Sequence, residues 1–434
     1  TPVVLDWLAA YDERVRVIHR EENGGEGPCR ATGMQAVRGE WMLALDADDL
    51  IVQGSLSELA SFLETTKADV VLSSHYRYDV PSKVARKVTL TKVGETLESG
   101  PFDPNKYRDT LFSRAGSGIA NKVFRIAHIR EHKVTFQDVE RIGDVHFTLA
   151  ALATARLVEF VDIPHYYYRV RLSTSLTHKG VKYPLSFAQA CYGLQDYLTQ
   201  AGLWETWRTG FLNWVVALLP YNLSMMESYE ACRMLASELY ERGFERMEFG
   251  KLEPDECVHP RRLSVCRSLY EDGPDEGLYT LMRLNRTDFE DKEMAYWKVR
   301  RDLTKARGDM KSRNARIREL ESQVSQKDDE LHDVWQSASM RIGRAITSAP
   351  RTLRDKLLAK RTPSAGASES EVPGPAQDAM PMASRQGDGH APLVSMIVPL
   401  TVGVADARRC IASLLAQDFK DLEVVVSCAD ETAA

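Results

Sequence analysis

The sequence lacks any apolar run as long as the ~18 residues that a membrane-spanning helix needs. Its longest apolar stretch, 211–219, is short and is followed by Pro220, a pattern typical of a buried helix. The chain also lacks an initiator Met and a signal peptide, and it opens on a helix-like run at 2–11. We therefore expect a fragment of a longer protein.

The seven cysteines show no Cys-x-x-Cys spacing, which argues against a zinc site and favours reduced thiols in the cytoplasm. Basic side chains number 56 and acidic ones 62, a net charge of -6, so the chain lacks the positive excess of a nucleic-acid-binding protein. Apolar residues at 44% and charged residues at 27% exclude collagen, a disulfide scaffold and a wholly disordered chain.

The 434 residues amount to about three average domains, and the pattern changes along the chain. Residues 1–160 alternate short apolar runs with helical patterns, which predicts an α/β layer fold. The expected strands are 15–18, 41–45 and 69–73, and the expected helices are 2–11, 28–37 and 55–64. From about 180 to 295 the pattern is helical and rich in Leu, Tyr and Trp.

A heptad repeat runs from 296 to 334, and we expect a long coiled-coil-like helix over 296–358. Arg313 and Lys327 interrupt its second stripe. Self-association through 296–334 and a single surface helix docked on the preceding helices both fit this pattern. The first stripe consists of Tyr296, Leu303, Met310, Ile317, Val324 and Leu331, and the second contains Val299, Ala306, Leu320 and Val334.

Residues 359–391 have the composition of a flexible linker, rich in Pro, Ser, Gly and Ala. A strand at 394–399, a helix at 405–417 and a strand at 422–426 follow. A β-α-β unit of this length cannot build a core alone. It belongs to a larger domain or docks on another part of this chain.

The sharpest motif is the acidic turn Asp46-Ala47-Asp48-Asp49 directly after the strand at 41–45. The carboxyl edge of an open α/β sheet is where such folds bind ligands. Carboxylate oxygens suit Mg²⁺ or Mn²⁺, which in turn neutralises a diphosphate, so Asp46 and Asp48 are candidate metal ligands. The alternative is an acidic turn in which Asp48 or Asp49 caps a short helix.

Four further motifs lie on either side of the acidic turn: Glu22-Asn23-Gly24-Gly25, Cys29-Arg30-Ala31-Thr32-Gly33, Gly39-Glu40 and Asn121-Lys122-Val123-Phe124-Arg125. In order and spacing, these motifs and the acidic turn resemble the family-two glycosyltransferases of the GT-A fold over residues 1–178. Ala31 departs from the family pattern, which usually has Asn there.

The segment Gly143-Asp144-Val145-His146-Phe147 resembles the family's Gly-Glu-Asp-x-x-Phe motif. The resemblance implies that Asp144 is the general base of an inverting transfer, with Gly143 where Glu is usual. The alternative is an acid at a helix N-terminus that interacts with the macrodipole.

The segment Tyr168-Arg169-Val170-Arg171 resembles the family's Tyr-Arg-x-Arg motif. The resemblance implies that Arg169 and Arg171 bind the leaving diphosphate of the donor, because guanidinium groups pair bidentately with phosphate. Arg30 is a further candidate for donor binding, with a solvated helix face as its alternative. His178 is a weaker candidate metal ligand.

The resemblance implies a single displacement on a nucleoside-diphosphate sugar, assisted by a divalent cation, with a glycan or lipid-linked acceptor. It implies no nucleic-acid partner. The setting would be bacterial surface-polysaccharide or cell-wall assembly in the cytoplasm, with peripheral contact at the inner face of the membrane. A nucleotidyltransferase and a catalytically degenerate interaction protein remain alternative readings of the same residues.

The tail, 392–434, resembles the opening β-α-β unit of the same family, which residues 1–178 lack. It fits the start of a second glycosyltransferase module. One hypothesis is that the tail docks in the vacant edge of the first sheet, which predicts pairing of 394–399 with 15–18 or 41–45. Simple truncation of a two-module protein is the plainer and preferred interpretation.

Overall fold

The computed structural model describes residues 2–22, 25–89, 100–171, 182–336, 392–400 and 404–429. Their contacts divide the chain into two units, one formed by Thr1–Leu284 with Val372–Ala434 and the other by Asn285–Glu371. Each unit is described by itself.

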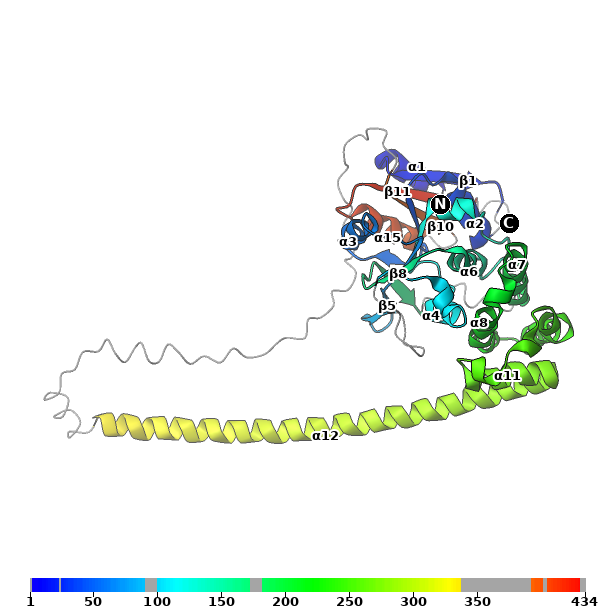
Figure 1. The fold of residues 1–434 in the computed structure, drawn as a ribbon. Helices are drawn as coiled ribbons and strands as arrows, with labels where there is room; N and C mark the ends of the chain where they lie inside the picture. Colours follow the sequence, from blue (N-terminus) through cyan, green and yellow to red (C-terminus); the bar gives the residue numbers. More distant parts are fainter. Residues whose placement is uncertain are drawn as a thin grey trace. The chain divides into compact units, whose positions relative to one another are not determined.

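A seven-stranded mixed sheet forms the centre of the first unit (Figure 1). The four strands on one side of the sheet run parallel, β2 and β4 each pair antiparallel with β7, and β8 is parallel to β4. In spatial order the strands are β1 Val15–Arg20, β11 Leu422–Ala429, β10 Val394–Leu400, β2 Trp41–Ala44, β7 Lys122–Arg125, β4 Val70–Ser73 and β8 Val158–Val161.

Helices cover both faces of this sheet, because its central strands are apolar on both sides. One core contains α2 (Glu26–Ala36), α6 (Asp144–Thr154) and the short helices α4 (Leu111–Ala115) and α5 (Ile126–Glu131). The opposite core contains α1 (Pro2–Tyr11), α3 (Ser55–Leu63) and α15 (Val404–Leu415). The result is the α/β layer fold that the sequence predicts.

A smaller sheet lies beside the acidic turn. Its strands are β3 (Leu50–Ile51), β9 (Tyr166–Val170), β5 (His75–Asp79) and β6 (Val84–Val88), in that order. Leu50 pairs with Tyr167 and Ile51 with Tyr166, so β9 runs next to the residues that follow Asp49. The sequence analysis did not predict this sheet, in which β5 is polar and half-buried and β6 is mostly exposed.

The helical region after residue 182 packs on the sheet domain rather than forming a separate core. Trp207 stacks on Phe112 of α4 with ring centroids 4.7 Å apart, and Gly210 lies against the backbone of Arg108. Its helices are α7 Ser186–Gln200, α8 Trp204–Ser224, α9 Tyr229–Glu238, α10 Phe244–Arg246 and α11 Pro260–Glu271.

Helix α8 contains the stretch 211–219, which the sequence predicts as a buried helix, and it continues through Pro220 to Ser224. Burial of its apolar side chains outweighs the backbone hydrogen bond that proline cannot donate. Within the described ranges, no helix combines the length and apolarity needed to cross a membrane.

The second unit is built on α12 (Pro274–Gln336), a single helix of 63 residues that begins in the first unit. Residues 296–334, where the sequence predicts a heptad-bearing helix, are helical throughout. Every side chain described between 297 and 329 is exposed. The remainder of the predicted long helix, 337–358, and the predicted linker, 359–391, lie outside the described residues.

The C-terminal β-α-β segment lies inside the main sheet. Val394–Ile397 of β10 pair in parallel with Trp41–Ala44 of β2, and β11 pairs with β1. This is the pairing that the docking hypothesis required, and the preferred interpretation of simple truncation did not anticipate it. The two tail strands occupy the positions between β1 and β2.

A buried ion-pair network fastens the tail to the first segment. Glu423 of β11 is only 2% exposed and pairs with Arg16 of β1 and with Arg38. Ser395 of β10 donates its hydroxyl to Glu423 at 2.7 Å and accepts the backbone N–H of Gly39 at 2.8 Å. Burial works to raise the pKa of Glu423, but these partners hold it below the usual value. The carboxylate is therefore satisfied only when the tail is docked.

Candidate functional site

The acidic turn forms a cluster of three carboxylates at the end of β2. Asp46, Asp48 and Asp49 each offer an oxygen, and these atoms lie within 4.8 Å of one another. The backbone N–H of Asp49 donates to the carbonyl of Asp46 at 2.9 Å, which closes the turn. The N–H of Leu45 donates to the carbonyl of Ile397 at 2.9 Å, so the tail supports the cluster from β10.

The charges in this cluster are only partly compensated. Burial and the charge of Asp46 raise the pKa of Asp48 to about 6. Asp49 is buried, and its pKa is raised by burial and by both neighbouring carboxylates. Its Oδ1 accepts the backbone N–H of Arg169 at 2.9 Å, while its buried Oδ2 has no hydrogen-bond partner among the described residues. Convergent oxygen ligands with an uncompensated charge fit a divalent cation.

Arg30 of α2 faces the cluster and is only 2% exposed, so the solvated-face alternative is wrong. Its Nη2 donates to Oδ1 of Asp46 at 2.5 Å, and its Nη1 lies 3.5 Å from Oε1 of Glu26. Burial opposes its charge, but Glu26, Asp46 and Asp144 hold its pKa above the ordinary value. One oxygen of Asp46 is therefore engaged by Arg30.

Asp144 is the first residue of α6 and lies within electrostatic reach of the same cluster. Burial raises its pKa to about 7; the charges of Arg30 and Lys122 oppose this shift, and those of Glu26 and Asp46 add to it. The helix N-terminus also favours the ionised carboxylate. Asp144 and Asp46 therefore both act on the charge of Arg30.

The backbone before Asp144 is constrained. Ile142 adopts a left-handed φ of 65°, which is costly for a β-branched residue. A Cβ on Gly143 would lie 3.1 Å from the Cα of Gly27 in α2, so the Glu usual in the resembled family has no room without movement of α2. This close approach fixes the start of α6 against the start of α2.

Lys122 of β7 is fully buried behind this region. Its Nζ donates to the carbonyls of Ala115 and Gly118 at 3.0 and 2.6 Å and to Oδ1 of Asn121 at 2.9 Å. Burial lowers its pKa to about 7, and the charge of Asp144 opposes that shift. Lys122 therefore holds the 115–121 loop and offers positive charge to Asp144.

Arg169 lies beneath the acidic turn rather than open to solvent. Its Nη1 donates to the carbonyl of Asp48 at 2.8 Å and to Oδ1 of Asp406 at 2.9 Å. Asp406 belongs to α15 of the tail and also pairs with Arg409. Arg169 therefore links the acidic turn to the tail.

Two further sequence candidates are not brought to the cluster. Arg171 has an exposed side chain that pairs with Asp79 of β5 in the smaller sheet. His178 lies outside the described residues.

Several residues near the cluster were not singled out from the sequence. Tyr168 is half-exposed, and burial together with the charges of Asp49 and Asp46 raises its pKa to about 12. Glu26 could have been found from its i,i+4 spacing to Arg30, whereas Asp406 becomes visible only once the tail is docked.

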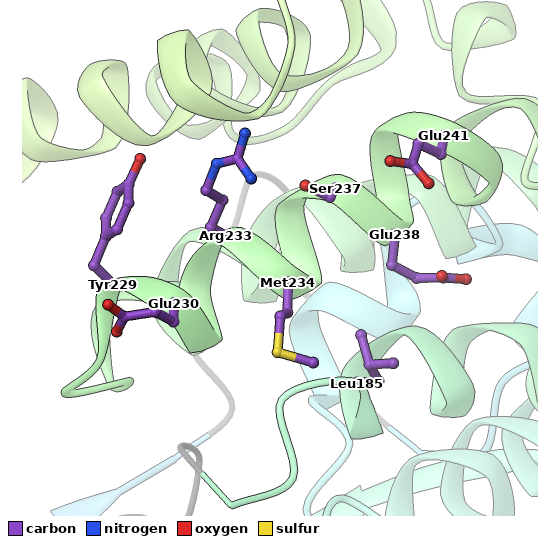
Figure 2. A pocket seen from close by; sticks show the side chains of 8 residues that line it. All are labelled: Leu185, Tyr229, Glu230, Arg233, Met234, Ser237, Glu238 and Glu241. Atoms are coloured by element: carbon purple, nitrogen blue, oxygen red, sulfur yellow. The ribbon is translucent and has the colours of Figure 1, made fainter.

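A separate shallow pocket of about 460 Å³ lies in the helical region (Figure 2). Tyr229 and Arg233 on one of its walls both contact Asp275 of α12, at 2.8 and 3.0 Å. It contains none of the predicted site residues. Its lining is Leu185, Tyr229, Glu230, Arg233, Met234, Ser237, Glu238 and Glu241.

Comparison with known proteins finds glycosyltransferases that are similar to part of this chain. Residues 1–130 match the family model described as glycosyl transferase family 2. EpsH of Bacillus subtilis is 29% identical over 180 residues, covering 40% of this chain and 50% of its own. The succinoglycan biosynthesis protein ExoO of Rhizobium meliloti is 26% identical over 175 residues, covering 39% of this chain and 49% of its own.

The chain therefore spans about half the length of these curated relatives. Among solved structures, residues 1–349 of TarS from S. aureus align with a TM-score of 0.43 and 18% identity. That alignment covers 61% of this chain and 72% of the TarS chain.

Proposed function

Since its residues 1–130 make this chain a member of glycosyl transferase family 2, we propose that it transfers a sugar from a nucleoside-diphosphate sugar to an acceptor hydroxyl. The observation that carries this proposal is that Asp46, which clusters with Asp48, and Asp144 both act on the buried Arg30. Asp144 is far from the acidic turn in the sequence.

Asp144 is proposed as the general base. The acceptor oxygen attacks the anomeric carbon as the bond from that carbon to the diphosphate oxygen breaks, and the hydroxyl proton passes to Asp144. One displacement inverts the configuration at the anomeric carbon. A raised carboxyl pKa suits this role, because proton transfer is most efficient when the base titrates near the working pH.

Asp46 and Asp48 are proposed to hold Mg²⁺ or Mn²⁺, which would offset the charge of the departing diphosphate. Arg30 is proposed to add positive charge on the same side, as a donor-binding residue. Arg169 and Arg171 remain proposed donor ligands, but each must first release its acid, Asp406 or Asp79.

The similarity to ExoO, a succinoglycan biosynthesis protein, supports a role in bacterial surface-polysaccharide or cell-wall assembly. A glycan or lipid-linked acceptor, a cytoplasmic location with peripheral contact at the inner membrane face, and self-association through 296–334 belong to the same proposal. We also propose that residues 392–434 derive from the opening of a second module and complete the donor-binding half of the sheet. The domains that we propose are therefore 1–178, 179–295, 296–358, 359–391 and 392–434.

The test is calorimetry of the full chain with UDP-, GDP- and dTDP-sugars in the presence of Mn²⁺, followed by product analysis. We expect one donor class to bind, and turnover to release a free nucleoside diphosphate. The Asp46→Asn variant should lose cation-dependent binding, whereas Asp79→Asn in the smaller sheet should retain it. Release of pyrophosphate would indicate a nucleotidyltransferase, and absence of donor binding would indicate an interaction protein.

A further inference from the structure

An apolar stripe on α12 is uncovered among the described residues of the second unit. Its members are between 43% and 66% exposed and repeat at heptad spacing. A lone helix gains little stability from its own hydrogen bonds, and aligned exposed apolar side chains are typical of an interaction surface. The stripe consists of Val299, Leu303, Met310, Ile317, Leu320 and Val324.

We propose that residues 297–329 pair with the same segment of a second copy as an antiparallel two-stranded coiled coil, centred between Lys311 and Ser312. This specifies the self-association proposed above and does not depend on the transfer activity. The charged residues within the seam select the direction, and the apolar layers and the edge charges are compatible with it.

The apolar layers match when the helix is reversed about this centre. Val299 of one copy then faces Val324 of the other, Leu303 faces Leu320, and residue 306 faces residue 317. Each layer occurs twice by symmetry, so six layers are apolar. The same surface serves both copies, as a two-fold interface requires.

The charged residues within the seam decide the direction. In a parallel, in-register pair Arg313 would face Arg313 and Lys327 would face Lys327, and such like-charge contacts oppose association. In the antiparallel pair Arg313 faces Met310, whose side chain can pack against the aliphatic part of the arginine. Lys327 then lies near the end of the paired segment.

The edges of the seam are also complementary to themselves in reverse. One edge carries Arg300 and Arg307 in its first half and Glu321 and Asp328 in its second half, so reversal brings opposite charges together. The other edge brings Asp302 opposite Arg316 but places Asp309 opposite its own copy. Its charged residues are Asp302, Asp309 and Arg316.

Cysteine cross-linking of the full chain tests the direction. Leu303→Cys and Leu320→Cys are prepared separately and treated with a short bismaleimide, alone and as an equal mixture, with the wild-type chain as background for its seven native thiols. We expect covalent dimers mainly in the mixture. Efficient linking of Leu303→Cys alone would overturn the proposal in favour of a parallel pair, and a monomer by light scattering would overturn it altogether.

A charge reversal provides an independent test. Arg307→Glu should weaken dimerisation by about tenfold, and addition of Glu321→Arg should restore it, because these residues face each other only in the antiparallel pair. In a parallel pair residue 307 faces 302 and residue 321 faces 316, so the double variant would be weaker than either single one. Ala315→Gln, on the outer face of α12, should leave dimerisation unchanged.

Discussion

Arg30 Nη2 lies 2.5 Å from Oδ1 of Asp46, although one residue belongs to α2 and the other follows β2. The arginine is buried, and three carboxylates surround it. It therefore compensates part of a negative charge that would otherwise destabilise the region. A ligand that binds at the acidic turn must therefore either leave this ion pair in place or displace Arg30 from Asp46.

Replacement of Arg30 should weaken donor binding. In Arg30→Gln, we expect the affinity for a nucleoside diphosphate with Mn²⁺ to fall by about tenfold, because one charge-assisted contact is lost. The pKa of Asp144 should rise, since Arg30 lowers it in the wild type. Calorimetry and the pH profile measure these effects. Arg30→Lys is the matched control, and equal binding by all three proteins would contradict the prediction.

Transfer activity should fall in acid. The pKa of Asp48 is about 6 and that of Asp144 about 7, so both carboxyls gain protons as the pH drops below neutrality. A protonated Asp144 cannot accept the acceptor's proton, and a protonated Asp48 binds a cation poorly. Initial rates between about pH 5 and about pH 8 at saturating Mn²⁺ should decline toward low pH. A flat profile would remove Asp144 as the base.

The acidic turn should reduce stability in the absence of a ligand. The folded-state pKa of Asp48 is raised, so between about pH 4 and about pH 6 the folded chain binds more protons there than the unfolded chain, and stability falls as pH rises. Asp48→Asn removes this effect, and we expect a gain of about 1 kcal/mol at neutral pH. Urea unfolding of both proteins at about pH 4 and at neutral pH measures the difference in their free energies of unfolding. The variant should be no more stable than wild type at low pH.

Gly33 tests whether the tail is docked. A Cβ on Gly33 of α2 would lie 2.5 Å from Cγ2 of Ile397 in β10. With the tail docked, Gly33→Ala should destabilise the fold by about 1–3 kcal/mol through overpacking. Without the tail, the same change should stabilise α2 by up to about 1 kcal/mol, because alanine favours a helix.

Urea unfolding separates a docked from an undocked tail, because the change in the free energy of unfolding of Gly33→Ala has the opposite sign in the two cases. Ile397→Ala should cost less stability in the Gly33→Ala background than in the wild type, since it removes Cγ2, the atom that the added Cβ would meet. A stabilised single variant would contradict docking.

The sequence predicted those elements that have a clear local pattern of apolar residues. The apolar runs at 15–18, 41–45 and 69–73 correspond to β1, β2 and β4, and the acidic turn follows β2 as expected. Strands β5 and β6 were not predicted because neither has a buried apolar run: β5 is polar and half-buried, and β6 is mostly exposed.

Contacts between segments that are distant in the sequence could not be predicted from local patterns. Arg169 faces Asp406 only because the tail supplies α15, and Gly33 of α2 lies against Ile397 only because the tail supplies β10. The heptad predicted a helix, but the partner of its stripe is inferred from charges spread over the whole segment. Local pattern fixes an element's type, whereas the partner of a buried charge depends on which elements pack together.

The docked tail also has a consequence for how the chain acquires its structure. The hydroxyl of Ser395 and the N–H of Gly39 form a hydrogen bond between positions 356 apart in the sequence. Contacts this remote carry a large loop-closure entropy and slow the formation of a sheet. During synthesis one edge of β2 therefore stays unpaired until β10 has left the ribosome, and an unpaired strand edge favours aggregation.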